Sequence, residues 1–314
     1  MLKCKEQKNI LERNGVLKLF KKESIRNFYL ENENGTRIDF QNQDGSLFLY
    51  DISGLGHEKT ISYDQIGDVF VPVSEKMVQT PITGTIEFDT KTDNSSETSY
   101  DSYNKFTDFV YNSKSLKLVY IPKLTNRVEY YRDIDFVSIE KSEEDDFGIL
   151  SCPIKLKPKS LWYKEGNAVI SINPSDNEMR WDFTWDAIFI DYNTSNIVYE
   201  NKGHTESAFE VIIDGFIENP SIEVYVDDVL MYNLAIDIEI EEFEKFIYSS
   251  KDGSPCIKKQ KADGTFENLF TSAYVSPANV NIFKLPKGTS KLKISADNDI
   301  NSAKITIYEY YKTV

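Results

Sequence analysis

Apolar and polar residues alternate in short segments along most of this 314-residue chain. Leu150, Cys152, Ile154 and Leu156, for example, are separated by residues that are mostly polar. Successive side chains of a strand point to opposite faces, so this period of two predicts sheets with one dry and one wet face. Composition agrees, because 88 residues are Ile, Val, Tyr or Phe and only 9 are Ala, the best helix former. The expected fold class is mainly β.

Turn signals separate the alternating segments. Asn34-Gly35 and Asp44-Gly45 are strong hairpin signals, because both central residues of the favoured two-residue turn need a positive φ. Pro153 lies within the strand expected over Leu150–Leu156 and lacks a backbone N–H, so that strand is expected to be at a sheet edge or bulged.

One stretch has the spacing of a helix instead. Tyr103, Phe106 and Val110 recur at intervals of three and four residues, which places them on one helical face. Ser99 is the expected N-cap, and the helix is expected to end near Asn112.

The length is sufficient for about two domains. Residues 1–26 form a basic arm, 27–164 the first domain and 165–314 the second, with the boundary in the Pro- and Trp-containing stretch around residue 164. The second half has almost no helical period and has turn signals at short intervals, which favours a β-sandwich. Its expected strands are Ala168–Ile172, Ala187–Asp191, Phe209–Ile213, Ile222–Val226, Ile236–Ile240, Phe246–Ser249, Lys291–Ser295 and Lys304–Tyr308.

Charge is unevenly distributed. The net charge is −15, but residues 1–26 hold eight Lys or Arg and three Asp or Glu, a net charge of +5. The remaining −20 argues against sequence-independent nucleic-acid binding, which requires a basic surface. Two interpretations of the basic arm stay open: contact with an acidic partner surface, or a solvated leader segment.

The sequence shows no sign of export, membrane insertion or disulfide formation. No apolar run approaches the roughly 18 residues of a membrane helix, and the first residues contain no apolar core of an export signal. Synthesis in the cytoplasm without membrane insertion is expected. Cys4, Cys152 and Cys256 are far apart and odd in number, as expected for reduced thiols without a disulfide or metal pattern.

The sequence contains no evident catalytic machinery. His57 and His204 are the only histidines, each in loop-like sequence, and the common hydrolase, metalloprotease and phosphate-binding motifs are missing. Asp297–Asn301 imitates the start of a calcium loop but lacks the following glycine, so a polar turn is the better interpretation. The acidic run Glu239–Glu244 is expected to form a wet sheet face. We expect no catalytic residue, metal or cofactor, and a carboxylate-pair glycosidase has no specific support.

A cluster of aromatic residues offers a different function. Trp181, Trp185 and Tyr192 are of the types that stack on sugar rings, so they are candidates for a carbohydrate-binding platform. Alternating aromatic residues on a strand also occur in cores, and core packing is the favoured interpretation. A glycan-binding adhesin or receptor-binding module is therefore the alternative function.

The order of these features resembles the distal tail proteins of tailed bacteriophages, which form the baseplate hub. The matching stretches are Asn34–Phe40, Ser53–Gly56, Ile82–Phe88, the helix with Tyr103 and Phe106, Leu116–Tyr120, Tyr130–Phe136, Ser151–Leu156, Leu161–Tyr163 and, in the second half, Phe283–Gly288. The resemblance covers about residues 27–314, and the basic arm is the main departure from it.

The resemblance implies a belt domain, a β-barrel or sandwich with one helix and a hairpin, followed by a galectin-like sandwich. It implies a hexameric ring at the virion tail tip that joins the tail-tube protein to a tail-associated lysin or tail-tip protein, and to receptor-binding proteins. Edge strands such as Leu150–Leu156 would be covered by neighbouring copies. The implied role is structural, not enzymatic.

Overall fold

The computed structural model describes residues 26–41, 46–89, 98–122, 127–171, 189–191, 196–272, 281–298, 300 and 302–314. The chain divides into two units. The first runs to Trp162 and includes Lys312–Val314, and the second is Tyr163–Tyr311. Strands dominate both units, which confirms the expected fold class. Within the described residues, no helix is long and apolar enough to span a bilayer.

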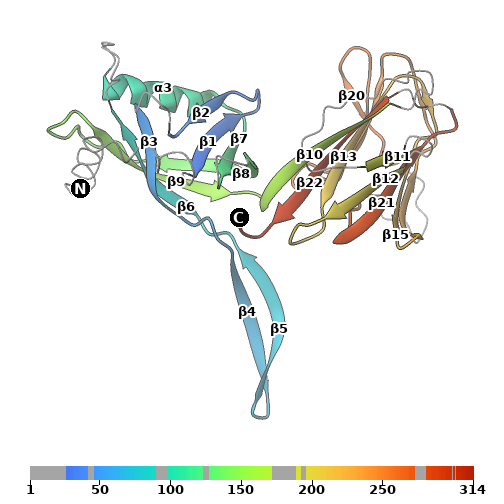
Figure 1. The fold of residues 1–314 in the computed structure, drawn as a ribbon, viewed down its shortest axis with the longest axis horizontal. Helices are drawn as coiled ribbons and strands as arrows, with labels where there is room; N and C mark the ends of the chain where they lie inside the picture. The colour runs from blue at the N-terminus through green and yellow to red at the C-terminus, as the bar shows by residue number, and fades with distance from the viewer. Residues whose placement is uncertain are drawn as a thin grey trace, which may run out of the picture. The chain divides into compact units, whose positions relative to one another are not determined.

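The first unit is built on an antiparallel sheet with the strand order β2-β1-β7-β8-β9-β6-β3 (Figure 1). Its strands are β1 (Asn27–Asn32), β2 (Arg37–Asp39), β3 (Leu47–Ser53), β6 (Ile82–Phe88), β7 (Leu116–Ile121), β8 (Tyr130–Ile139) and β9 (Leu150–Pro158). The ends of this order meet only at an isolated bridge between Gln41 and Phe48, so the described strands form no closed barrel.

The turn between β1 and β2 confirms one hairpin prediction. Gly35 has a φ of 75°, and its N–H donates to the carbonyl of Asn32 at 3.0 Å. Leu30 then pairs with Ile38 across the hairpin. The second signal, Asp44-Gly45, lies outside the described residues.

Of the two alternatives for Leu150–Leu156, the edge position is wrong, and a bulge does occur, but in the neighbouring strand β8. β9 pairs with β6 along one side and with β8 along the other, so it lies inside the sheet. The proline is tolerated because β8 ends at Ile139, opposite Ile154, so Pro153 lies just past the end of that ladder, where its carbonyl accepts from Glu140 N–H.

Helix α3 (Ser99–Asn112) covers one face of this sheet (Figure 1). It ends where the sequence predicts, but the N-cap is Thr98 and not Ser99. Thr98 and Asp101 form a reciprocal capping box, which satisfies two of the free N–H groups of the first turn. Ser99 is buried in the first turn, and its hydroxyl donates to Glu144.

Phe106 fixes the helix to the sheet. Its ring is 1% exposed and lies 5.6 Å from Phe88 of β6, 5.8 Å from Phe136 of β8 and 6.1 Å from Phe40, measured between ring centroids. The two closer pairs are edge-to-face, the favoured geometry for aromatic rings. This cluster is the centre of the core of the first unit.

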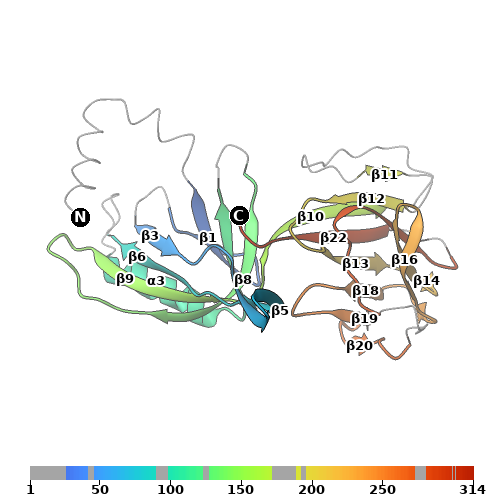
Figure 2. The ribbon, with the colours of Figure 1, turned by 90° about the horizontal axis from the view of Figure 1, so that it is seen from below.

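The second unit contains two larger antiparallel sheets. One has the order β10-β22-β13-β18-β19-β20, whose last strands lie side by side in Figure 2, and the other β11-β12-β21-β15-β16. The strands are β10 (Trp162–Ser171), β11 (Phe189–Asp191), β12 (Asn196–Asn201), β13 (Ala208–Asp214), β14 (Ile217–Glu218), β15 (Ser221–Val226), β16 (Val229–Ala235), β17 (Glu239–Ile240), β18 (Lys245–Ser249), β19 (Cys256–Gln260), β20 (Phe266–Asn268), β21 (Gly288–Ser295) and β22 (Ser302–Tyr311).

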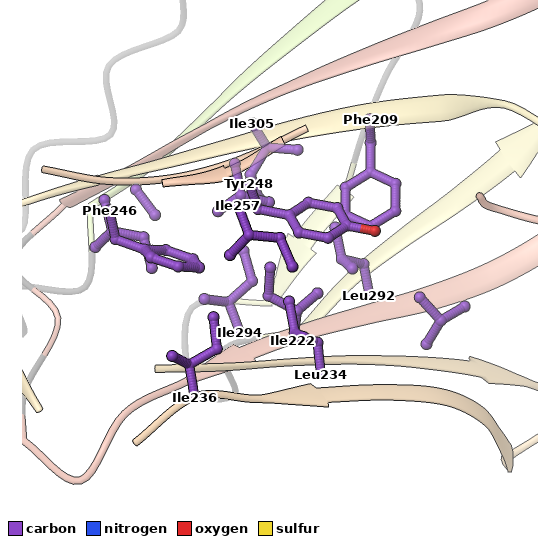
Figure 3. Close-up of a cluster of buried hydrophobic side chains, with 14 of the residues drawn as sticks. Phe209, Ile222, Leu234, Ile236, Phe246, Tyr248, Ile257, Leu292, Ile294 and Ile305 are labelled. Carbon is purple, nitrogen blue, oxygen red and sulfur yellow. The ribbon is translucent and has the colours of Figure 1, made fainter. Parts of the chain in front are cut away.

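The core of this unit lies between the two sheets (Figure 3). Phe209 and Tyr248 come from one sheet and face Ile222, Leu292 and neighbouring aliphatic side chains from the other. The Tyr248 hydroxyl donates to the carbonyl of Phe283 at 3.0 Å, so its buried oxygen is satisfied. Two apolar faces packed in this way make a β-sandwich.

One expected strand has a different form. Ile236 and Ile240 are buried, as the alternation predicts, but only Glu239–Ile240 is a strand, β17, and it pairs with β14. The residues before β17 make single backbone hydrogen bonds instead of a regular ladder. The Ile236 N–H donates to the Pro220 carbonyl, and the Ile238 carbonyl accepts from the Asn219 N–H. Alternation therefore indicated burial but not continuous pairing.

Candidate interaction surfaces

A two-stranded arm projects from the first unit (Figure 1). It consists of β4 (Glu58–Ile66) and β5 (Val69–Val78), which pair only with each other. Gly67, with a φ of 64°, and Asp68 form the two-residue turn at the tip. Isolated hairpins are only marginally stable in water, so an arm of this length needs further contacts to persist.

The arm is apolar on both faces. Ile66 pairs with Val69 at the tip, and Val71 lies on that same face. Phe70 lies on the other face, where Tyr63 opposes Pro72. The exposed large apolar residues of the arm are Tyr63, Ile66, Val69, Phe70, Val71, Val73 and Met77, which are 38–67% exposed. Contiguous apolar surface of this kind marks an interaction site on a folded protein.

The base of the arm is fixed to the unit at two adjacent residues, Gly54 and Leu55. Gly54 has a φ of 80°, and a Cβ placed there would lie 2.1 Å from the Pro81 carbonyl oxygen, so only glycine fits. The next residue, Leu55, accepts a hydrogen bond at 3.0 Å from the indole Nε1–H of Trp162, which is fully buried. The arm therefore leaves the unit in a direction set by packed residues.

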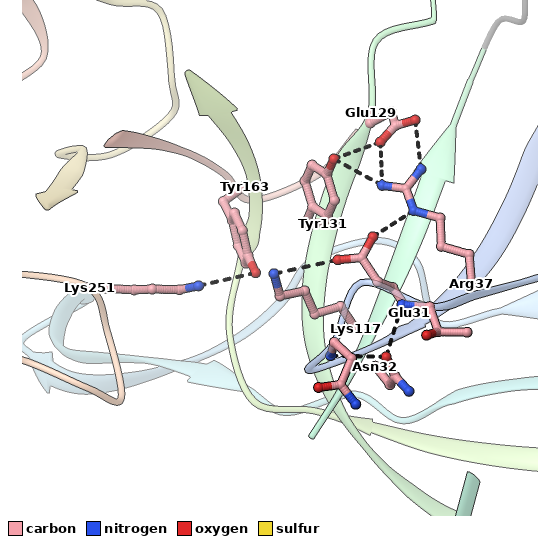
Figure 4. A network of polar contacts seen from close by, with 10 residues as sticks. Glu31, Asn32, Arg37, Lys117, Glu129, Tyr131, Tyr163 and Lys251 are labelled. Atoms are coloured by element: carbon pink, nitrogen blue, oxygen red, sulfur yellow. Dashed lines mark hydrogen bonds and ion pairs between the residues drawn. The ribbon is translucent and has the colours of Figure 1, made fainter. Parts of the chain in front are cut away.

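A charged network ties β1, β2 and the start of β8 together (Figure 4). Arg37 Nε donates to Glu31 at 2.6 Å, and its two Nη atoms donate to the two oxygens of Glu129 at 3.0 and 2.8 Å. Tyr131 also donates to Glu129, at 2.6 Å. A bidentate pair of this geometry positions both partners strongly. It joins two of the stretches on which the family resemblance rests.

Contacts within this network shift the pKa values of its members. Partial burial favours the neutral carboxyl of Glu129, but hydrogen bonds from Arg37 and Tyr131 outweigh this and lower its pKa. Burial and the hydrogen bond to Glu129 raise the pKa of Tyr131. The hydrogen bond to Glu129 likewise raises the pKa of Arg37. The charged pair is therefore retained at neutral pH.

Removing the Glu129 charge is expected to have a pH-dependent effect. Since folding depresses the pKa of Glu129, its stabilisation is fully present above its unfolded pKa and is lost as the pH falls through the folded value. Glu129→Gln should lower the free energy of unfolding by about 1 kcal/mol at neutral pH. Urea unfolding should show this difference shrinking as the pH falls below the unfolded glutamate pKa of about 4.3. A difference that is constant with pH would contradict this assignment.

Among the described residues of this unit, Arg132 is the most buried cation. It is 8% exposed, its Nε donates to the Ser160 carbonyl at 3.0 Å, and its guanidinium lies 5.3 Å from the centre of the Trp162 ring. Burial lowers the pKa of Arg132 to about 10, which leaves it charged at neutral pH. It thus supports the tryptophan that holds the base of the arm.

The aromatic candidates Trp181, Trp185 and Tyr192 lie outside the described residues, as do Cys4 and nearly all of the basic arm. The carbohydrate-binding platform therefore stays a prediction. His204 packs edge-to-face on Tyr311 at 5.3 Å, whereas His57 lies in the loop before β4. The structure does not bring either histidine together with Cys152, which is buried in β9.

The acidic motifs have structural roles. Asp297 accepts from Asn219 at 2.7 Å, and Asn298 accepts from the Glu218 N–H at 2.9 Å, which fits a polar turn. Across the described residues, no cluster of three metal-ligating side chains occurs. The wet face expected for Glu239–Glu244 is wrong at Glu244, which is buried and pairs with Lys259 at 2.5 Å.

Comparison with known proteins identifies part of the chain. Residues 27–159 match the family described as distal tail protein, N-terminal domain. No curated protein sequence matches the chain.

Solved structures match almost the whole chain. A chain of the phage p2 baseplate in its activated conformation with Sr has a TM-score of 0.62 at 16% identity, covering 92% of this chain and 100% of that one. The same baseplate with Ca gives 0.61 at 16% identity, with the same coverage. The phage SPP1 Dit protein, described as a paradigm of hub adsorption apparatus in Gram-positive infecting phages, gives 0.53 at 10% identity, covering 90% and 98%. At these identities, the matches establish a shared fold.

Proposed function

We propose that this chain, whose residues 27–159 match the distal tail protein N-terminal domain, assembles as a closed ring of six copies at the tip of a phage tail. Its role there is structural rather than catalytic. The likeness to a baseplate chain and to a hub protein, over at least 90% of this chain, supports this placement.

The arm β4–β5 carries the proposal. It is apolar on both faces, its base is fixed by Gly54 and Trp162, and nothing else in the described part of the unit pairs with it. In this proposal, a neighbouring copy buries the exposed apolar faces of the arm. Because the arm and the surface that receives it are different, the contact is heterologous and repeats from copy to copy until the ring closes.

The ring has two sides with different partners in this proposal. One side binds the tail-tube protein, and the other binds a tail-associated lysin or tail-tip protein. The second unit, a galectin-like sandwich over residues 165–314, serves as a docking platform for receptor-binding proteins. Assembly takes place in the host bacterial cytoplasm before the particle is released.

Mass photometry at micromolar concentration tests the ring. The unaltered chain should give particles of six times the 36.2 kDa chain mass. Phe70→Ser combined with Val71→Ser removes one apolar side chain from each face of the arm, and this variant should remain monomeric with unchanged circular dichroism. Phe266→Ser, which alters a 58% exposed ring of the second unit, is the matched control and should form the ring. A monomeric unaltered chain, or rings of the arm variant, would overturn the proposal.

A further inference from the structure

Two exposed aromatic rings line one hollow on the second unit. Phe216 is 45% and Phe243 78% exposed, and the hollow between their segments has a volume of about 740 Å³. Asp214, Glu242 and Lys245 are also among its lining residues. Exposed phenylalanine side chains that share a hollow have no role in the core, so this surface requires an explanation outside the folding of the unit.

Backbone contacts hold the hollow open. Gly215 N–H donates to the Glu244 carbonyl at 3.3 Å, and β14 pairs with β17 beside it. Asn298 Nδ2 donates to the Phe216 carbonyl at 3.1 Å. Phe243 has a φ of 71°, a left-handed conformation that bulky residues rarely adopt. The turn that presents this ring to solvent is therefore maintained against local strain.

The rim of the hollow is acidic. Its lining residue Glu242 is exposed, and so are Asp237, Glu239 and Glu241 of the segment that leads up to it; none of these carboxylates has an ion-pair partner in the part of the chain that the structure describes. The nearby lysines do not compensate for them. Lys245 pairs with Asp214 at 2.8 Å, and Lys259 pairs with buried Glu244.

An acidic rim around apolar rings selects its occupant by chemistry. It repels nucleic-acid phosphates and anionic lipid headgroups, and it attracts a basic segment that also has apolar side chains. Residues 1–26 have this chemistry: a net charge of +5 together with Leu17, Leu19 and Phe20. We propose that residues 1–26 of one copy bind the Phe216–Phe243 hollow of a neighbouring copy.

The inference rests on the proposed ring for its choice of a neighbouring copy. The basic segment is at the start of the first unit, and the acidic hollow belongs to the second unit. A contact between unlike surfaces is what a closed ring repeats. The basic segment then acts as a strap between copies, in addition to the arm.

A synthetic peptide of residues 1–26 tests the hollow directly by fluorescence anisotropy. The receptor is the full chain with Phe70→Ser and Val71→Ser, used below 1 μM, so that its association through the arm does not interfere. Peptide binding should weaken at least about tenfold when Phe243→Ser, or Glu241→Lys with Glu242→Lys, is added. Asp146→Lys with Glu206→Lys makes the same charge change elsewhere and should leave binding within about twofold. Equal weakening in this control would overturn the proposal.

Substitutions in the peptide provide the second part of the test. Leu17→Ser, Leu19→Ser and Phe20→Ser keep its charge and should weaken binding about tenfold. An unchanged affinity would mean that the hollow is not used. If the chain's own segment occupied the hollow, Lys18→Glu, Lys21→Glu and Lys22→Glu in the receptor would free it and tighten peptide binding. We expect no change, and tightening would overturn the neighbouring-copy assignment.

The two proposals fail separately. If the unaltered chain forms rings but the peptide binds the hollow variants as tightly as the unaltered hollow, only the strap proposal fails. If the peptide binds the hollow selectively but the unaltered chain stays monomeric, only the ring proposal fails.

Discussion

Phe106→Ala is expected to lower the free energy of unfolding of the first unit by about 3–5 kcal/mol. The ring is 1% exposed and contacts the rings of Phe40, Phe88 and Phe136, so its removal leaves a cavity where the helix meets three parts of the sheet. Phe106→Leu fills most of that space and should cost about 1.5 kcal/mol or less. Urea unfolding followed by near-ultraviolet circular dichroism measures the loss.

Tyr111→Ala is the matched control, because Tyr111 lies on the same helix and is 74% exposed. It should change the free energy of unfolding by no more than about 0.5 kcal/mol. If Phe106→Ala were as mild as this control, the aromatic cluster would not be the centre of the core.

Gly54→Ala is expected to lower the free energy of unfolding by at least about 2 kcal/mol and to prevent assembly of the proposed ring. Two penalties add here: an L-residue must adopt a φ of 80°, and its Cβ would lie 2.1 Å from the Pro81 carbonyl oxygen. The second contact is with backbone, so relief requires movement of the segment that enters β6. The arm base then loses its fixed direction. Thermal unfolding and mass photometry report the two effects.

Gly67→Ala separates the effect of a positive φ from the effect of a steric clash. Gly67 has a φ of 64°, but no atom lies within 4 Å of a Cβ placed there. This variant should therefore lose only about 1 kcal/mol and should still form the ring. Equal damage from both variants would show that conformation alone, and not the contact with Pro81, constrains Gly54.

Local patterns predicted the parts of the fold that depend on neighbouring residues. Alternation and turn chemistry identified the mainly β class, the hairpin at Asn34-Gly35 and the end of helix α3. The cap was placed one residue late because Thr98 and Ser99 are both good caps, and only the reciprocal bond with Asp101 distinguishes them. The central position of Leu150–Leu156 depends on pairing with residues far away in sequence, which Pro153 alone could not reveal.

The interaction surfaces were less accessible from sequence. The resemblance implied one hairpin in the first domain, but the residue pattern did not locate the arm, because its strands are apolar on both faces and show no clean alternation. Its one local signal is Gly67-Asp68, a glycine-first turn between Ile66 and Val69. The pairing of Arg37 with Glu129, 92 residues apart, exists only in the folded sheet. Likewise, nothing in the sequence distinguishes exposed Phe243 from a core phenylalanine.

The bond between Trp162 and Leu55 also sets a sequence of events during synthesis. The donor follows the acceptor by 107 residues, so the arm has left the ribosome long before the indole that fixes its base. At synthesis rates of roughly 5–20 residues per second, this delay is roughly 5 to 20 s. A nascent chain therefore has an unanchored arm until its first unit is complete. In the proposed ring, a chain could therefore receive a neighbour through a fixed arm only after its first unit has closed.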